Sequence, residues 1–160
     1  TGMLRSAHML GNEEEIIFAA TDLLADTKLA PELSNEAHYY RAKAYLDAGK
    51  TDGAMEDLKV LAKDTRNVYG AEAKYKVAQI YFDGGQTDKA EQEVLNYIEV
   101  STPHTYWLAR SFVLLADVYM KLGRNLDAKQ YLLSLKQNYQ ADDDIAGMIE
   151  SRLEKLKTEN

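Results

Sequence analysis

Apolar residues recur along the chain at the spacing of α-helices, in segments that come in pairs. In one segment, Ala42, Tyr45 and Ala48 follow one another at intervals of three, which places them on one face of a helix. In the next segment, Ala54 and Leu58 lie four residues apart and also share a helical face. The pattern predicts two helices that pack through these faces and are joined by a short turn.

The paired segments repeat at a regular distance, which four glycines mark. Gly11, Gly49, Gly85 and Gly123 lie 38, 36 and 38 residues apart. Around the last three glycines, a tyrosine stands four residues before and an alanine five residues after. Glycine ends a helix readily because it adopts the left-handed conformation without steric cost. The fixed spacing therefore indicates a repeat protein in which one helix–turn–helix unit is stacked several times.

These signals predict an all-α protein of nine helices. Thr51, Thr87 and Asn125 follow three of the glycines at a distance of two residues, and we expect them to cap the second helix of each unit. Acidic residues at 142–144 predict the beginning of the last helix. The expected helices cover residues 2–10, 12–26, 32–48, 51–64, 68–84, 87–100, 104–122, 125–139 and 142–157.

We expect a single solenoid domain over residues 1–160. It comprises a truncated first repeat at 1–30, full repeats at 31–66, 67–102 and 103–140, and a capping helix at 141–160. Few residues precede Gly11, so we expect the chain to be a piece of a longer protein. The capping helix should present a polar outer face. That face is expected to carry Glu150, Arg152, Glu154, Lys155 and Lys157.

Composition narrows the classes of function. The chain has 26 acidic and 19 basic residues, a net charge of −7 and no basic stripe, which argues against binding to nucleic acid. No apolar run is long enough to span a membrane. The absence of cysteine excludes disulfides and thiolate metal sites, and the three histidines lie far apart in sequence. We therefore expect no metal, no cofactor and no enzymatic activity.

Three segments share the pattern A-x-x-Y-x-x-x-G-x-x-x-x-A-x-x-x-L/V, namely AKAYLDAGKTDGAMEDL, AQIYFDGGQTDKAEQEV and ADVYMKLGRNLDAKQYL. The pattern resembles the tetratricopeptide repeat (TPR) family. The resemblance implies a right-handed α-solenoid whose first helices line a concave groove, where a peptide or helix of a partner protein binds. The long units and the acid-started last helix are similar in style to bacterial cell-envelope TPR proteins, such as periplasmic Tol–Pal accessory proteins and outer-membrane assembly lipoproteins. That likeness would place the protein in the periplasm or cell envelope of a bacterium.

The resemblance also implies which residues face the groove. The residues expected to contact a partner are Tyr39, Tyr40, Lys43, Tyr75, Lys76, Gln79, Phe82, Arg110, Asp117, Met120 and Lys121. Tyr39 and Tyr75 lead this set because Tyr45 and Tyr81 are expected to fill the core face. Phe82 is a further leading contact, although packing against the neighbouring unit is an equal alternative for it and for Met120.

Some TPR domains hold the C-terminal carboxylate of a chaperone through lysine, asparagine and arginine. The equivalent places here are occupied by Glu36, Tyr40, Glu72, Lys76, Arg110 and Leu114. Two glutamates in this set repel a carboxylate, so we expect no binding of that kind.

Two features leave alternatives open. The truncated first repeat is expected to expose Ile16, Phe18 and Leu24 unless something covers them. This keeps open a homodimer through residues 1–26, or a structural module of a larger enzyme or assembly with no ligand of its own. Arg41 stands where the family usually has leucine. A buried arginine there needs a carboxylate partner; otherwise its helix is rotated or partly exposed.

Overall fold

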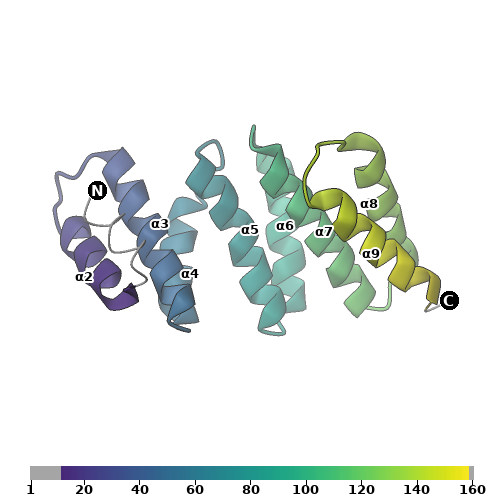
Figure 1. Ribbon diagram of the computed structural model, residues 1–160, viewed down its shortest axis with the longest axis horizontal. Coiled ribbons are helices and arrows are strands. Elements are labelled where there is room, and N and C mark those ends of the chain that lie inside the picture. The colour runs from purple at the N-terminus through teal and green to yellow at the C-terminus, as the bar shows by residue number, and fades with distance from the viewer. Residues whose placement is uncertain (1–11, 159–160) are drawn as a thin grey trace. The chain divides into compact units, whose positions relative to one another are not determined.

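The computed structural model describes residues 12–158, in which eight α-helices follow one another through short connections and no strand occurs (Figure 1). The all-α class expected from the sequence is confirmed. The helix expected at 2–10 lies outside the described residues. The eight helices are α2 (Glu13–Leu24), α3 (Pro31–Asp47), α4 (Thr51–Leu61), α5 (Val68–Asp83), α6 (Thr87–Val100), α7 (Thr105–Lys121), α8 (Asn125–Asn138) and α9 (Ile145–Thr158).

Glycine ends α3, α5 and α7 as the repeat predicts. At the end of α3, Gly49 has a φ of 76°, and the N–H of Lys50 donates to the carbonyl of Tyr45 at 2.7 Å. The N–H of Gly49 donates to the carbonyl of Leu46 at 3.1 Å. These two bonds form a Schellman cap, which satisfies the free carbonyls at a helix end. Equivalent bonds recur at Gly85 and Gly123, so the repeated tyrosine supplies the accepting carbonyl each time.

Two expectations about helix starts are wrong by a small number of residues. The caps of α4, α6 and α8 are Lys50, Gln86 and Arg124, none with a side-chain capping bond, and the expected caps are the first helical residues. The last helix begins at Ile145 rather than at 142, because a carboxylate oxygen of Asp143 accepts the N–H of Ile145 at 2.9 Å. A side chain that binds the backbone in this way holds the preceding residues outside the helix.

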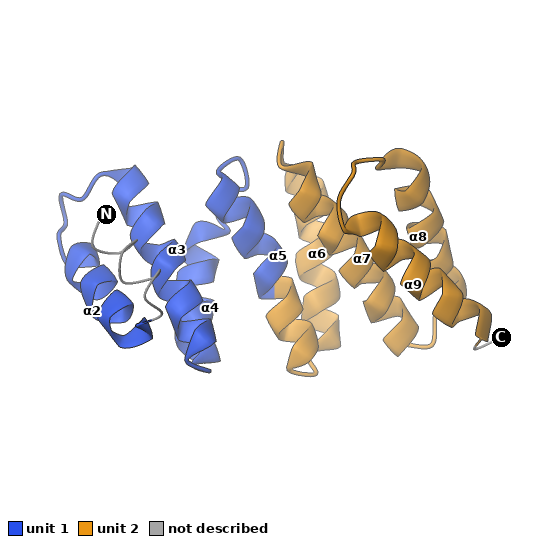
Figure 2. Cartoon of the chain, in the orientation of Figure 1, with its two compact units in different colours: residues 1–77 blue, residues 78–160 orange. Residues whose placement is uncertain are grey.

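The chain divides into two compact units, residues 1–77 and 78–160, with the boundary inside α5 (Figure 2). In unit 1, α3 packs against both α2 and α4. In unit 2, α7 packs against α6, α8 and α9, and α8 also contacts α9. Packing between neighbours in the chain is what helix–turn–helix repeats require. The single domain expected over residues 1–160 stays a prediction.

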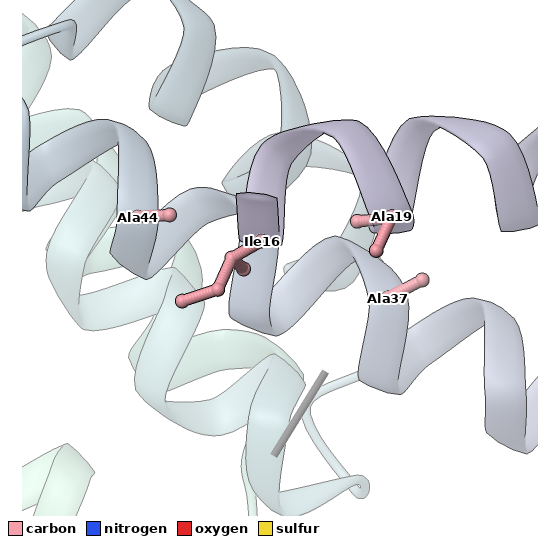
Figure 3. Packing of buried hydrophobic residues seen from close by; sticks show 5 residues of the cluster. Ile16, Ala19, Ala37 and Ala44 are labelled. Carbon is pink, nitrogen blue, oxygen red and sulfur yellow. The ribbon is translucent and has the colours of Figure 1, made fainter. Parts of the chain in front are cut away.

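Small residues bring α2 and α3 close together in unit 1. Figure 3 shows Ile16 and Ala19 of α2 facing Ala37 and Ala44 of α3, and all four side chains are buried. Alanines at a helix crossing allow the two backbones to approach. Ile16, one of the residues expected to be exposed unless something covers it, is covered by α3 and is 1% exposed. Phe18, one of the residues expected to be uncovered, is 73% exposed.

Arg41 of α3 has the carboxylate partner that a buried arginine needs. Its guanidinium binds the carboxylate of Asp57 in α4, and the Asp57 side chain is buried. The side chain of Arg41 is 19% exposed, so the helix position is partly open as well as paired. Both solutions that the sequence leaves open, a carboxylate partner and partial exposure, occur together.

Candidate functional site

A cavity of about 530 Å³ lies on unit 2, where the end of α5, the second half of α7 and the second half of α9 supply its lining. We call it the α7–α9 cavity. Its lining residues are Phe82, Asp117, Met120, Lys121, Ser151, Arg152 and Lys155. Four of the groove residues expected from the sequence are therefore brought together here.

Helical spacing explains why these side chains converge. Asp117, Met120 and Lys121 lie at positions i, i+3 and i+4 of α7, which share one face of a helix. Arg152 and Lys155 are three residues apart in α9 and share a face in the same way. Because α7 packs against α9, the two faces border the same hollow.

An ion pair across the cavity fixes α9 to α7. The Nε and Nη2 atoms of Arg152 donate to the two carboxylate oxygens of Asp117, at 2.7 and 2.9 Å. The Nη1 atom of Arg152 also donates to the carbonyl of Met148 at 3.2 Å. A two-bond arginine–carboxylate pair restricts geometry as well as neutralising charge. Asp117 and Arg152 therefore shape the cavity and are both satisfied within the protein.

The remaining lining combines free positive charge with apolar surface. Lys121 and Lys155 are exposed, and neither forms an ion pair with another described residue. The Nζ atom of Lys121 lies 5.9 Å from the centre of the Phe82 ring. Phe82 and Met120 are half-buried, so part of each apolar side chain is open to a ligand. A cation beside an aromatic face is a common feature of recognition sites.

In unit 1, the expected groove residues Lys43 and Lys76 belong to a cluster around Tyr39. The ring of Tyr39 stacks on that of Tyr69 at 4.3 Å, and its hydroxyl donates to Glu72 at 3.0 Å. The ammonium of Lys43 lies 5.3 Å from the Tyr39 ring, and Lys76 pairs with Glu72. Burial, with the neighbouring carboxylate of Glu72, raises the pKa of Tyr39 above its ordinary value. Tyr39 is thus held by several partners and remains half-buried.

Two other tyrosines of unit 1 are placed differently from the expectation. Tyr75 is buried, with 7% exposed, whereas Tyr45 is half-buried. The expectation that Tyr45 fills the core and leaves Tyr75 accessible is therefore wrong. Tyr45 instead lies over Gly53, where an added Cβ would meet its ring at 3.1 Å. Tyr40 packs against the apolar cluster between α2 and α3.

Gln79 and Arg110 belong to unit 2, and neither is among the described residues that line the α7–α9 cavity. The amide of Gln79 donates to Asp83 at 2.8 Å within α5. The guanidinium of Arg110 lies 6.0 Å from the ring of Tyr106 and 5.9 Å from that of Trp107. These contacts lie within unit 2, and both residues stay predicted partner contacts.

Sequence reasoning missed the contribution of α9 to the site. The sequence pattern places Arg152 and Lys155 on the outer polar face of a capping helix, but both line the cavity with Ser151. The sequence does contain a signal for this contribution. Each second helix of a unit is followed by the first helix of the next unit, and α9 follows the second helix α8 in the same way. Applying the groove pattern once more to α9 would have placed its charged face beside that of α7.

Residues 12–158 hold no cluster of three or more histidine, cysteine or acidic side chains arranged to bind a metal ion. Within the same range, no helix combines the length and the apolar character that crossing a membrane requires.

Two segments of the chain match family models that are each described as a tetratricopeptide repeat. The first covers residues 36–64, and the second covers residues 109–138. They lie on α3–α4 and on α7–α8, inside two of the expected repeats. The chain therefore carries tetratricopeptide repeats. Repeats of this kind are typical of non-enzymatic scaffolds that bind other proteins, and the matches identify no catalytic domain.

No curated protein and no solved structure matches the chain. The likeness to bacterial cell-envelope proteins therefore rests on the style of the repeats alone.

Proposed function

We propose that the protein is a scaffold that binds a peptide or helix of a partner protein through the α7–α9 cavity. The observation that carries this proposal is the convergence of Phe82, Asp117, Met120 and Lys121 around one hollow. Repeat position alone predicts these four residues as partner contacts. Their convergence on a cavity is independent support, because a cavity depends on how α5, α7 and α9 pack.

The size and lining of the cavity suit side chains of a bound segment. About 530 Å³ lies within the usual range of roughly 300–1,000 Å³ for ligand sites. Covering the open parts of Phe82 and Met120 removes apolar surface from water, which favours binding by about 25 cal/mol per Å² before the costs of association. The fixed Asp117–Arg152 pair provides a preorganised wall, which lowers the entropic cost of binding.

Tyr39 and Lys43 remain proposed contacts on unit 1. Each is half-buried, and the stacked ring of Tyr39 is already ordered by Tyr69 and Glu72. An ordered aromatic ring loses little side-chain entropy on binding.

A selection from displayed random peptides tests the proposed function. Peptides enriched on the wild-type protein are synthesised, and their affinities are measured by calorimetry for the wild type, Met120→Ala and Met148→Ala. Met120 lines the cavity, whereas Met148 is a half-buried methionine in the same unit whose side chain is not part of the lining.

We expect binding to weaken about five-fold or more with Met120→Ala, as loss of an interface side chain commonly does. Met148→Ala should leave the affinity unchanged. Failure to enrich any peptide, or equal effects of the two substitutions, would contradict a binding role for the cavity. The first of those results would favour a structural module with no ligand of its own.

Self-association is a second candidate function, and one observation favours it. Phe18 in α2 is 73% exposed, the highest value among the large apolar side chains that the structure describes. A homodimer through residues 1–26 would cover it. Light scattering at increasing concentration, on the wild type and on Phe18→Ser, tests this directly. A concentration-dependent mass that Phe18→Ser abolishes supports the dimer, and a constant monomer mass excludes it.

A further inference from the structure

The charge of the α7–α9 cavity differs in sign from that of the whole chain. Its lining carries three cationic side chains and one carboxylate, whereas the chain has a net charge of −7. Arg152 and Asp117 neutralise each other through their two hydrogen bonds. Lys121 and Lys155 therefore leave the cavity with an excess of two positive charges that no described carboxylate compensates.

The positive charge adjoins apolar surface. The Nζ atom of Lys121 lies 5.9 Å from the centre of the Phe82 ring. Met120, the residue before Lys121 in α7, lines the same cavity. A ligand that reaches this lysine also meets an aromatic ring and a thioether. The complementary ligand therefore carries negative charge beside a large apolar group, rather than negative charge alone.

We infer that the cavity binds an acidic internal segment of a partner protein, in which aspartate or glutamate side chains flank a large apolar residue. The apolar side chain contacts Phe82 and Met120, and the flanking carboxylates pair with Lys121 and Lys155. This inference rests on the proposed function and specifies the chemistry of the partner at the same site.

The alternatives fit the surface less well. A nucleic-acid backbone needs many phosphate contacts, and two lysines on a chain of net charge −7 supply few. A terminal carboxylate is not required, because side-chain carboxylates present the same charge. Glu36 and Glu72, the residues that oppose a terminal carboxylate, both belong to unit 1 and do not line this cavity.

Matched peptides separate the role of charge from that of apolar contact. One peptide carries Asp and Glu on both sides of a phenylalanine, and its partner carries Asn and Gln at the same positions. Both are acetylated and amidated, so that neither has a charged terminus. Calorimetry measures their binding to the wild-type protein, to Lys121→Glu with Lys155→Glu, and to Lys28→Glu with Lys63→Glu. The last pair makes the same change in net charge at exposed lysines of unit 1.

We expect the acidic peptide to bind the wild type more tightly than the amide peptide does. Reversing both cavity lysines should weaken binding of the acidic peptide by about ten-fold or more, because each exposed ion pair contributes up to about five-fold. The control pair should change it by less than about two-fold, and added salt should weaken binding of the acidic peptide. Lys121→Gln with Lys155→Gln, which avoids new like-charge contacts, should show an intermediate loss.

Three results would overturn the inference. The two peptides could bind equally well, the control pair could reduce binding as much as the cavity pair, or a short single-stranded DNA could bind at the cavity more tightly than the acidic peptide. If library-selected peptides bind through Met120 but the acidic peptide does not bind, the inference fails while the proposed function stands. If Met120→Ala affects no peptide, the proposed function itself fails.

Discussion

The guanidinium of Arg41 holds the buried carboxylate of Asp57 through two hydrogen bonds, from Nη2 at 2.6 Å and from Nε at 2.8 Å. His38, one turn earlier in α3, places its Nδ1 atom 2.7 Å from the same carboxylate. Asp57 is 1% exposed, so its charge depends wholly on these partners. The pairing joins α3 to α4 inside the first matched repeat. It also explains how the fold accommodates Arg41 at a position where the family usually has leucine.

Substitution of Asp57 should cost more stability than any nearby charge change. Asp57→Asn removes the carboxylate and leaves the Arg41 guanidinium without its counter-charge. Breaking a buried ion pair in this way typically costs about 3 kcal/mol or more. Urea unfolding followed by circular dichroism measures the loss. Glu56→Gln, an exposed acid at the preceding position, is the matched control and should change stability by less than about 0.5 kcal/mol.

The same carboxylate predicts a dependence of stability on pH. Burial by itself raises the pKa of Asp57, but hydrogen bonds from Arg41 and His38 outweigh it and lower the pKa below its ordinary value near 3.8. Since the folded-state pKa is depressed, the stabilisation is present above about pH 4 and is lost as the pH falls through the folded-state pKa. The wild type should therefore lose stability on acidification by more than Asp57→Asn does. Parallel profiles of the two proteins would show that Asp57 does not titrate in this way.

Gly70 is required by close packing rather than by its φ angle. A Cβ at this position would lie 1.8 Å from the carbonyl oxygen of Asp64 and 2.6 Å from that of Leu61. Both atoms belong to the backbone, so Gly70→Ala forces α5 away from the end of α4. We expect a loss of about 1–3 kcal/mol, as for overpacking in a core. Urea unfolding of the variant measures this loss.

Gly147 provides the matched control for that substitution. It is helical, in α9, and has no neighbouring atom within 4 Å of an added Cβ. Gly147→Ala should stabilise the protein by up to about 1 kcal/mol, because alanine is the better helix former. Opposite signs at the two glycines are the expected result. A stabilising Gly70→Ala would mean that α5 does not approach α4 so closely.

The helical frame was largely predictable because its signals are local. The ranges expected for α3, α6 and α8 agree with the observed helices to within one residue at each end. Periodicity defines a helix within a few turns, and a glycine with positive φ ends it whatever lies elsewhere in the chain. The start of α9 departs from its expected position because a side-chain bond from Asp143 competes with the helix.

The site was less predictable because it depends on relations between helices. The sequence predicts that Arg41, if buried, needs a carboxylate partner, or else that its helix is rotated or partly exposed. The choice of Asp57 as that partner depends on how α3 and α4 are aligned. Repeat position placed Tyr75 in the groove, while its burial depends on packing in the folded unit. The capping-helix pattern places Arg152 on the solvent face, whereas in the structure Arg152 binds Asp117, which lies 35 residues earlier in the chain. Charge pairs of this separation leave no local pattern.

The hydroxyl of Tyr39 should contribute measurably to the stability of unit 1. It donates to the carboxylate of Glu72, and hydrogen bonds to charged groups are stronger than neutral ones. Since Tyr39 is half-buried, we expect Tyr39→Phe to lose about 1 kcal/mol in urea unfolding. Tyr45→Phe, in the same helix, removes a hydroxyl group that makes no hydrogen bond to another described residue. It should leave the free energy of unfolding nearly unchanged. Equal losses would show that the bond to Glu72 is not the cause.

The Asp117–Arg152 pair should couple α7 to α9 more strongly than an ordinary surface ion pair does. Its two hydrogen bonds join side chains that are 25% and 28% exposed. The comparison pair, Lys136 and Glu150, joins α8 to α9 through one contact of 2.7 Å, and these side chains are 55% and 58% exposed. Double-mutant cycles with Asp117→Asn and Arg152→Ala, and with Lys136→Ala and Glu150→Gln, measure the two coupling energies. We expect about 1 kcal/mol for the first and less than about 0.5 kcal/mol for the second, with the second falling further in salt. Equal coupling energies would mean that the Asp117–Arg152 pair holds α9 no more firmly than a surface ion pair does. That result would contradict the preorganised wall of the α7–α9 cavity.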